Sequence, residues 1–158
     1  MPGSPQSSAP PVSADGPSCS IAATLTVIGD RWTLLILRDI FRGVRRFTQL
    51  REDLGIAKNI LSDRLQKLVD AGVLETVEYQ QRPVRYEYRL TTKGQDLSPS
   101  LVALMHWGDR WYADAGPPTV LVHDECGTPL QNVTRCPECS EDIAPAHISS
   151  RPGRTEHT

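Results

Sequence analysis

The sequence lacks several features that would place it in a known class of protein. None of its apolar runs approaches the length of a membrane-spanning helix, and its amino-terminal segment has neither the basic start nor the apolar stretch of a signal peptide. We therefore expect a cytoplasmic protein with no membrane partner. No phosphate-binding glycine loop is present, and no nucleophile, base and orienting group stand at supportive spacing, which argues against an enzyme.

Apolar and basic residues are also scarce when averaged over the chain. Hydrophobic residues make up 39% of the 158 residues, which is low for a globular protein, so part of the chain is expected to lie outside a core. A net charge of −2 and a pI near 6.1 do not suggest a nucleic-acid binder. Residues 19–112, however, hold 14 Lys and Arg against 11 Asp and Glu, whereas the rest holds 3 against 8. The acidic average is thus a property of the two ends.

Residues 46–75 carry the strongest local pattern, in which apolar residues recur at helical spacing on both sides of Gly55. These residues are Phe47, Leu50 and Leu54 before the glycine, and Leu61, Leu65, Leu68 and Val69 after it. The pattern predicts two short helices joined by a tight turn. A plain helical hairpin in a core would show the same leucines, but a polar outer face and a basic hairpin downstream favour a DNA-binding helix-turn-helix.

The outer face of the second helix mixes donors and acceptors that can reach base edges and phosphates. Its candidate DNA-contacting residues are Lys58, Asn59, Ser62, Asp63, Gln66 and Lys67. Four arginines add candidate contacts to phosphates or to a narrow groove: Arg45 and Arg46 before the motif, and Arg82 and Arg85 in the hairpin after it. The alternative for each residue is an ordinary solvated side chain.

The flanking segments predict a scaffold that is mainly helical with a small β-wing. A short amphipathic helix is expected to end near Gly29, and Asp30 can cap a second, largely apolar helix. Residues 74–79 and 84–90 are typical of two antiparallel strands around a polar and basic tip. A last helix is expected to begin at Thr91 or Thr92 and to be kinked by Pro99.

Composition divides the chain into four segments. Residues 1–18 are nearly all Pro, Ser, Gly and Ala and are expected to form a disordered tail. Residues 19–116 are expected to form one domain built on the helix-turn-helix and the hairpin, residues 119–148 a Cys- and His-containing segment, and residues 149–158 a second tail.

Four potential metal ligands stand close together in residues 119–148. His123 and Cys126 form one H-x2-C pair, and Cys136 and Cys139 form a C-x2-C pair nine residues later. The ligand types and their paired spacing indicate a zinc-ribbon-like or knuckle-like appendage. The zinc would be structural, because four protein ligands leave no open coordination position for chemistry. His147 is an alternative to His123. A Cys136–Cys139 dithiol that cycles between redox states, or unrelated cysteines, are the competing interpretations.

Cys19 stands at the start of the first expected helix, where the helix dipole favours a reactive thiolate. A redox-sensing thiol is therefore one interpretation of this residue. The alternative is a small buried residue at a helix start.

Together these segments resemble the HxlR family of bacterial winged-helix transcription regulators, which are relatives of the MarR regulators. The resemblance is carried by Cys19, by the blocks 28–50, 61–75 and 82–94, and by Trp107-Gly108. It implies a homodimer formed mostly by the first and last helices, a pseudo-palindromic operator, and a wing that reaches the flanking minor groove. Several members of the family sense oxidants or electrophiles through a cysteine at the position of Cys19. Many members have Ser or Thr where Ala57 stands, so this recognition helix is expected to lack a side-chain cap.

The expected function is a DNA-binding transcriptional regulator, more specifically a repressor, with double-stranded DNA and a second copy of the chain as partners. A redox or electrophile signal at Cys19, or a small-molecule effector at the dimer interface, would alter occupancy of the operator. The alternative is a protein-interaction module in which the carboxy-terminal cysteines serve redox or metal chemistry.

Overall fold

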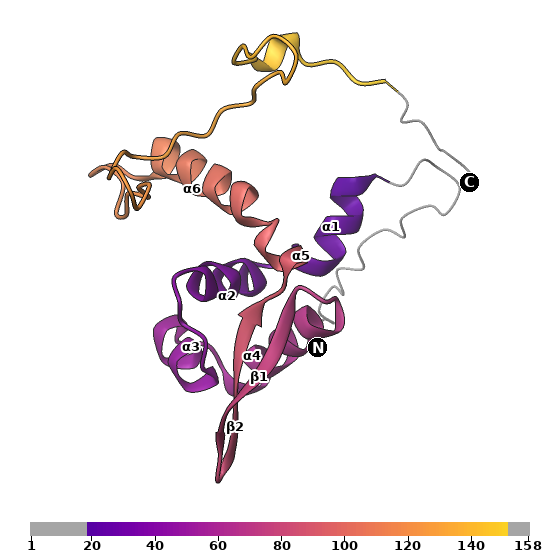
Figure 1. The fold of residues 1–158 in the computed structure, drawn as a ribbon, viewed down its shortest axis with the longest axis vertical. Helices are drawn as coiled ribbons and strands as arrows, with labels where there is room; N and C mark the ends of the chain where they lie inside the picture. The colour runs from indigo at the N-terminus through magenta and orange to yellow at the C-terminus, as the bar shows by residue number, and fades with distance from the viewer. Residues whose placement is uncertain (1–18, 152–158) are drawn as a thin grey trace, which may run out of the picture. The chain divides into compact units, whose positions relative to one another are not determined.

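The computed structural model of the chain describes residues 19–151. The expected tail over residues 1–18 and most of the one over residues 149–158 lie outside the described residues. The elements run in the order α1 Ser20–Ile28, α2 Arg31–Phe41, α3 Phe47–Leu54, α4 Lys58–Asp70, β1 Leu74–Gln81, β2 Val84–Leu90, α5 Thr92–Gln95, α6 Ser98–Tyr112 and the 3-10 turn η1 Pro145–His147 (Figure 1). This confirms a mainly helical fold with a two-stranded antiparallel wing.

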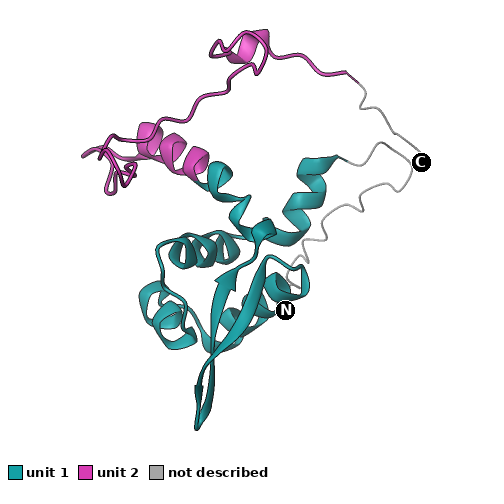
Figure 2. Cartoon of the chain, viewed as in Figure 1, with its two compact units in different colours: residues 1–101 teal, residues 102–158 magenta. Residues whose placement is uncertain are grey.

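The chain divides into two compact units, the first ending at Leu101 and the second beginning at Val102 (Figure 2). The division therefore falls within α6 and not at the glycine and prolines after residue 115. Among the described residues no single helix is long and apolar enough to cross a membrane, and α1 with α2 meets that length and composition only as a pair bent by 79°.

The core of the first unit is built on α2, which packs against α3, α4 and β2. Ten apolar side chains are buried in it: Ile36, Leu37, Ile40, Leu50, Ile56, Leu61, Leu65, Leu68, Val73 and Leu74. Asp30 begins α2 as predicted, because its carboxylate accepts hydrogen bonds from the backbone N–H groups of Trp32 and Thr33, both at 3.1 Å. The leucines of residues 46–75 thus serve burial.

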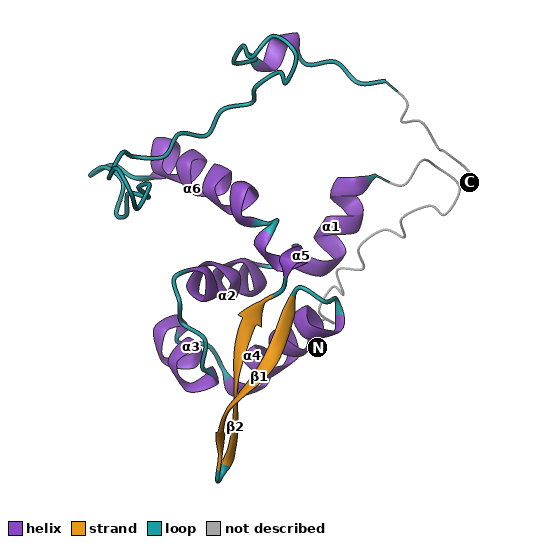
Figure 3. Ribbon diagram, in the orientation of Figure 1, coloured by secondary structure: helices purple, strands orange, loops and turns teal. Residues whose placement is uncertain are grey.

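The wing is an antiparallel hairpin in which Leu74 pairs with Leu90 at one end and Gln81 with Val84 at the other (Figure 3). β1 extends two residues further than predicted, so the turn is reduced to Arg82 and Pro83, whose peptide bond is cis. The register shifts between Glu78 and Gln80, which marks an irregularity in β1. The tip of the wing is exposed on both strands.

The last helical region is two helices and not the single kinked helix that the sequence predicts. Thr91 caps the short α5, with its hydroxyl accepting from the Gly94 N–H at 3.2 Å and donating to the Gly72 carbonyl at 2.6 Å. The chain then starts α6 at Ser98, so that Pro99 falls in the first turn of a new helix. Proline is tolerated there because the first turn needs no N–H donor.

Candidate nucleic-acid interface

The turn between α3 and α4 sets the angle at which the second helix leaves the core. Gly55 ends α3 in the left-handed region with φ of 60°, which glycine adopts without strain, and Ile56 is buried beneath the turn. Ala57 precedes α4 in an extended conformation and makes no side-chain capping hydrogen bond, as the sequence predicts. The first N–H groups of α4 therefore have no side-chain acceptor from their capping residue.

The two faces of α4 have opposite character. Leu61, Leu65 and Leu68 are at most 1% exposed and attach the helix to the core. All ten residues predicted to contact DNA are exposed, six of them on the outer face of α4 and the others beside it or on the wing. Exposure is a condition for DNA contact, and the contacts themselves stay a prediction.

Several polar groups on the outer face are already engaged within α4. The Asp63 carboxylate lies 3.2 Å from both the Lys67 ammonium and an Arg64 guanidinium nitrogen. The Gln66 amide donates to the Asp70 carboxylate at 2.7 Å. Within residues 19–151, no side-chain hydrogen bond or ion pair engages Lys58 or Asn59. The amino-terminal turn of α4 thus presents the polar side chains that are most available to a partner.

Arg64, on α4, makes a long-range contact that the sequence analysis did not identify. Its Nε lies 3.2 Å from Oδ1 of Asp30, the residue that caps α2, and both side chains are partly exposed. Burial acts to raise the pKa of Asp30, but hydrogen bonds from Thr33 and Trp32 and the charge of Arg64 outweigh it, so this pKa is lowered. The carboxylate thus contributes stability above its unfolded pKa, and the contribution is lost as pH falls through the lower folded value. The ion pair joins α4 to the start of α2.

Arg45 and Arg46 are joined to the wing through their backbone. The Tyr88 N–H donates to the Arg45 carbonyl at 2.8 Å, and Arg46 forms an antiparallel bridge with Glu87. The Arg46 guanidinium lies 4.4 Å from the ring centroid of Tyr79 on β1, a cation–π contact. These arginines therefore belong to the base of the wing as well as to the start of α3.

Arg82 and Arg85 stand at the far end of the wing. Arg82 lies in the turn, where its carbonyl accepts from the Gln80 amide at 3.0 Å. Arg85 is paired with Gln80 across the hairpin and is exposed. Both arginines therefore lie at the opposite end of the hairpin from the Leu74–Leu90 pair, and their contact with DNA stays a prediction.

Cys19 occupies the N-cap position of α1, is exposed, and makes no side-chain capping hydrogen bond. The structure thus gives the thiol access to solvent, which a redox sensor requires. The expectation of a redox role stays a prediction.

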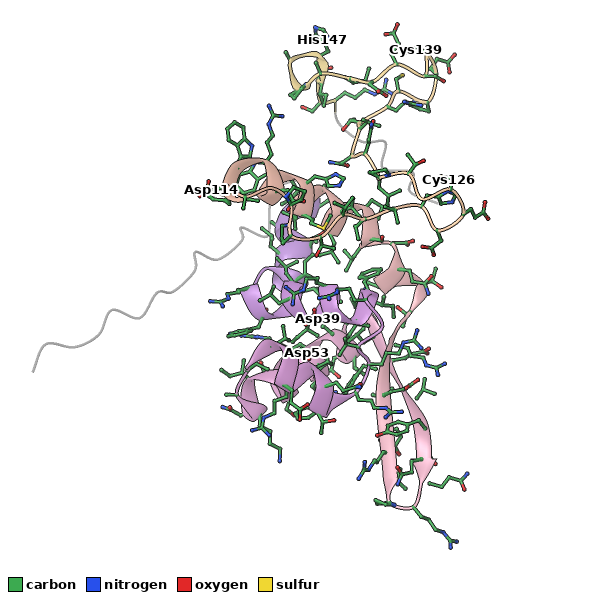
Figure 4. The ribbon with its side chains drawn as sticks, turned by 90° about the vertical axis from the view of Figure 1, so that its left-hand side faces the viewer. Asp39, Asp53, Asp114, Cys126, Cys139 and His147 are labelled. Carbon is green, nitrogen blue, oxygen red and sulfur yellow. The ribbon has the colours of Figure 1, made fainter. Side chains whose placement is uncertain are left out.

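The four predicted metal ligands lie on two separate hairpins of the second unit, which Figure 4 marks by Cys126 and Cys139. His123 Nδ1 lies 3.3 Å from Cys126 Sγ. Hydrogen bonds with Thr128, and to a lesser extent the one with His123, lower the pKa of Cys126 to about 7. Backbone N–H groups of Cys139 and Glu138 lower the pKa of Cys136. Across residues 19–151, no group of three or more metal-binding side chains is assembled, so each pair is brought together but the two pairs are not.

Comparison with known proteins agrees with this geometry. The model of the HxlR-like helix-turn-helix family matches residues 27–115. An uncharacterised HTH-type transcriptional regulator of Mycobacterium tuberculosis is 44% identical over 135 residues, covering 85% of each chain. The crystal structure of PA1607, a candidate transcription factor, matches with a TM-score of 0.78 and 38% identity over 86% of this chain and 96% of that one. The redox regulator HypR in its oxidised form matches with a TM-score of 0.54 and 30% identity over 58% of this chain and 96% of that one.

Proposed function

Because the chain belongs to the HxlR-like helix-turn-helix family of transcriptional regulators, we propose that it binds a pseudo-palindromic operator as a homodimer and represses transcription there. The observation that carries the proposal is the amino-terminal turn of α4, where the exposed Lys58 and Asn59 make no side-chain hydrogen bond or ion pair within the described residues. A B-DNA major groove admits one α-helix, and the first residues of a recognition helix are those that reach base edges.

In this proposal each part of the interface has a separate role. Asn59 reads a base edge, with an amide able to donate and accept toward adenine, and Lys58 holds a phosphate. Arg82 and Arg85 on the wing enter or flank the neighbouring minor groove. Arg45 and Arg46 neutralise phosphates at the base of the wing. Since these contacts release counterions, the affinity falls steeply with salt.

Dimerisation is supported by apolar side chains that the chain leaves in solvent on two helices. On α1, Ile21 is 71% exposed and Leu25 is 55% exposed, one helical turn apart. On α6, Leu104, Trp107 and Trp111 are 52–61% exposed at the spacing of one helical face. Exposed apolar stripes of this kind mark protein interfaces, and a second copy of the chain would cover both.

Selection of bound sequences from a random DNA pool tests the proposal. We expect enrichment of two inverted half-sites whose centres lie about 10–10.5 base pairs, or a multiple of that, apart, because each recognition helix of a dimer enters one major groove. If the selection enriches no sequence, sequence-specific binding is contradicted. A single enriched half-site would contradict the homodimer and leave the DNA-binding role intact.

A redox signal at Cys19 is a second element of the proposed function. It is favoured by the exposed thiol at the start of α1 and by the likeness to HypR, a redox regulator whose structure has been solved in its oxidised form. Since α1 carries part of the proposed dimer surface, a change at Cys19 would act on the distance between the two recognition helices.

We expect Cys19→Ser to abolish the change in operator affinity that peroxide causes in the wild-type protein, while leaving the affinity of the reduced protein unchanged. The measurement is fluorescence anisotropy of labelled operator DNA before and after oxidation. Cys139→Ser serves as the matched control, because Cys139 is also exposed but lies in the second unit. An equal peroxide response in wild type and Cys19→Ser would rule out this thiol as the sensor.

A further inference from the structure

The second unit contains a tandem structural repeat that neither the family match nor the DNA-binding site explains. The hairpins around His123–Cys126 and Cys136–Cys139 have the same backbone hydrogen bonds at an offset of thirteen residues. In the first, the Gly127 N–H donates to the His123 carbonyl at 2.7 Å and the His123 N–H to the Thr128 carbonyl at 2.9 Å. In the second, the Ser140 N–H donates to the Cys136 carbonyl at 2.9 Å, and the Cys136 N–H donates to the Glu141 carbonyl at 3.0 Å.

The repeat extends to an unusual backbone conformation. The residue after the second ligand of each pair has a positive φ, 69° at Gly127 and 60° at Ser140. Among the described residues Ser140 is the only residue other than glycine with a positive φ. A side chain in the left-handed region costs about 1–2 kcal/mol, so the chain keeps this turn at a cost in stability. In both hairpins the turn brings the two ligands onto one side.

The ligand spacing in the first hairpin fits a tetrahedral zinc ion. Bond lengths of about 2.3 Å for Zn–S and about 2.0–2.1 Å for Zn–N place two tetrahedral ligands about 3.6 Å apart. His123 Nδ1 and Cys126 Sγ are 3.3 Å apart, within a few tenths of an ångström of that separation. The pair is therefore set for one metal ion and supplies half of its ligands.

The rest of the second unit provides little buried surface that could stabilise the two hairpins. From Val102 to Arg151 no residue is buried, and Val120, Val122 and Val133 are 45–53% exposed. A unit with two ordered turns and no apolar core needs another source of stability, for which a structural metal is a common solution. All four cysteines of the chain are free.

We propose that one zinc ion binds His123, Cys126, Cys136 and Cys139 and joins the two hairpins into a single zinc ribbon. Two ligands alone leave a zinc ion half coordinated, whereas two repeats supply the four nitrogen and sulfur ligands of a closed structural site. The nine residues between Cys126 and Cys136 form a loop short enough to keep the pairs at high local concentration. Metal binding is thus coupled to the docking of one hairpin on the other.

The site is independent of operator binding, and its test uses the full chain purified without chelators. We expect about one zinc ion per chain by elemental analysis, and near zero in Cys126→Ser and in Cys136→Ser. Cobalt added to the metal-free protein is expected to give the intense visible bands of tetrahedral coordination together with thiolate charge transfer. Cys19→Ser is the matched control, because it removes a cysteine outside the proposed site and is expected to retain the zinc.

Hydrogen exchange tests the docking of the two hairpins in the wild-type chain, without any substitution. Zinc added to the metal-free wild-type chain is expected to protect amides of residues 120–148 and to leave those of α2 and α4 unchanged. Zinc well below one per chain in the wild type, a Cys136–Cys139 disulfide in the freshly isolated protein, or weak octahedral cobalt bands would each overturn the proposal. Loss of zinc in His147→Ala, with retention in His123→Ala, would overturn the ligand set.

Discussion

Replacing Lys58 and Asn59 together with alanine is expected to weaken binding to the selected operator by about 30- to 20,000-fold. A side-chain contact to a base edge contributes about 1–3 kcal/mol. The proposed homodimer presents each residue twice, and about 1.4 kcal/mol corresponds to a tenfold change in affinity. Fluorescence anisotropy of labelled operator, titrated with wild type and variant at one salt concentration, measures the effect.

The salt dependence identifies which part of the loss is electrostatic. Lys58→Ala alone removes one proposed phosphate contact from each protomer, so we expect the slope of log affinity against log salt to fall by about 2. Asn59→Ala alone is expected to leave the slope unchanged and to relax the base preference at one position of each half-site. Loss of affinity with equal slopes for both variants would contradict these separate roles.

A matched control comes from the second unit. Arg151→Ala with Asn132→Ala also removes one cation and one amide, both from exposed positions. Operator affinity is expected to stay within about twofold of wild type. Alanine is the strongest helix former, so the Lys58 and Asn59 variants are expected to keep α4 intact. If the double variant at Lys58 and Asn59 bound as tightly as this control, α4 would not be the recognition helix.

Local signals in the sequence were sufficient to predict most of the first unit. The leucine spacing on both sides of Gly55 predicted α3 and α4, and the confirmed cap at Asp30 depends on residues two and three positions away. The alternation from Val84 to Leu90 predicted β2 with the bounds that the structure shows. Such features depend on short-range periodicity and on caps, which a single sequence records directly.

Contacts between distant segments could not be predicted in the same way. Asp30 and Arg64 are thirty-four residues apart, and neither charge has a spacing that indicates the other. The bridge between Arg46 and Glu87 involves one residue on each side. Such a bridge is too short to produce an alternating pattern in the sequence. The break between α5 and α6 depends on where Pro99 falls within a helical turn, which periodicity did not resolve.

The candidate metal ligands illustrate both cases. Their chemistry and paired spacing were evident from the sequence, whereas the thirteen-residue repeat was not, because the two hairpins share little beyond Glu125-Cys126 and Glu138-Cys139. Backbone hydrogen bonds and a positive φ made the repeat visible. Sequence similarity between the hairpins is weak because their shape depends on backbone hydrogen bonds and one turn residue, and most of the remaining positions are exposed.

Leu65→Ala is expected to lower the free energy of unfolding of the first unit by about 2–5 kcal/mol. Leu65 lies on the inner face of α4 and is 1% exposed, so the substitution removes buried apolar surface and leaves a cavity against α2. In a unit of this size each kcal/mol corresponds to about 4–8 °C in melting temperature. Urea unfolding followed by circular dichroism measures the change, at one protein concentration because dimerisation adds to apparent stability.

Leu65→Met is the matched control, since it nearly conserves volume and is expected to cost less than about 1.5 kcal/mol. The Lys58 and Asn59 variants are expected to change stability by no more than about 0.5 kcal/mol, because those side chains are exposed. At a temperature where Leu65→Ala is fully folded, its operator affinity is expected to match wild type. An unfolding curve equal to wild type together with lost binding would contradict the division of α4 into a buried face that sets stability and an exposed face that binds DNA.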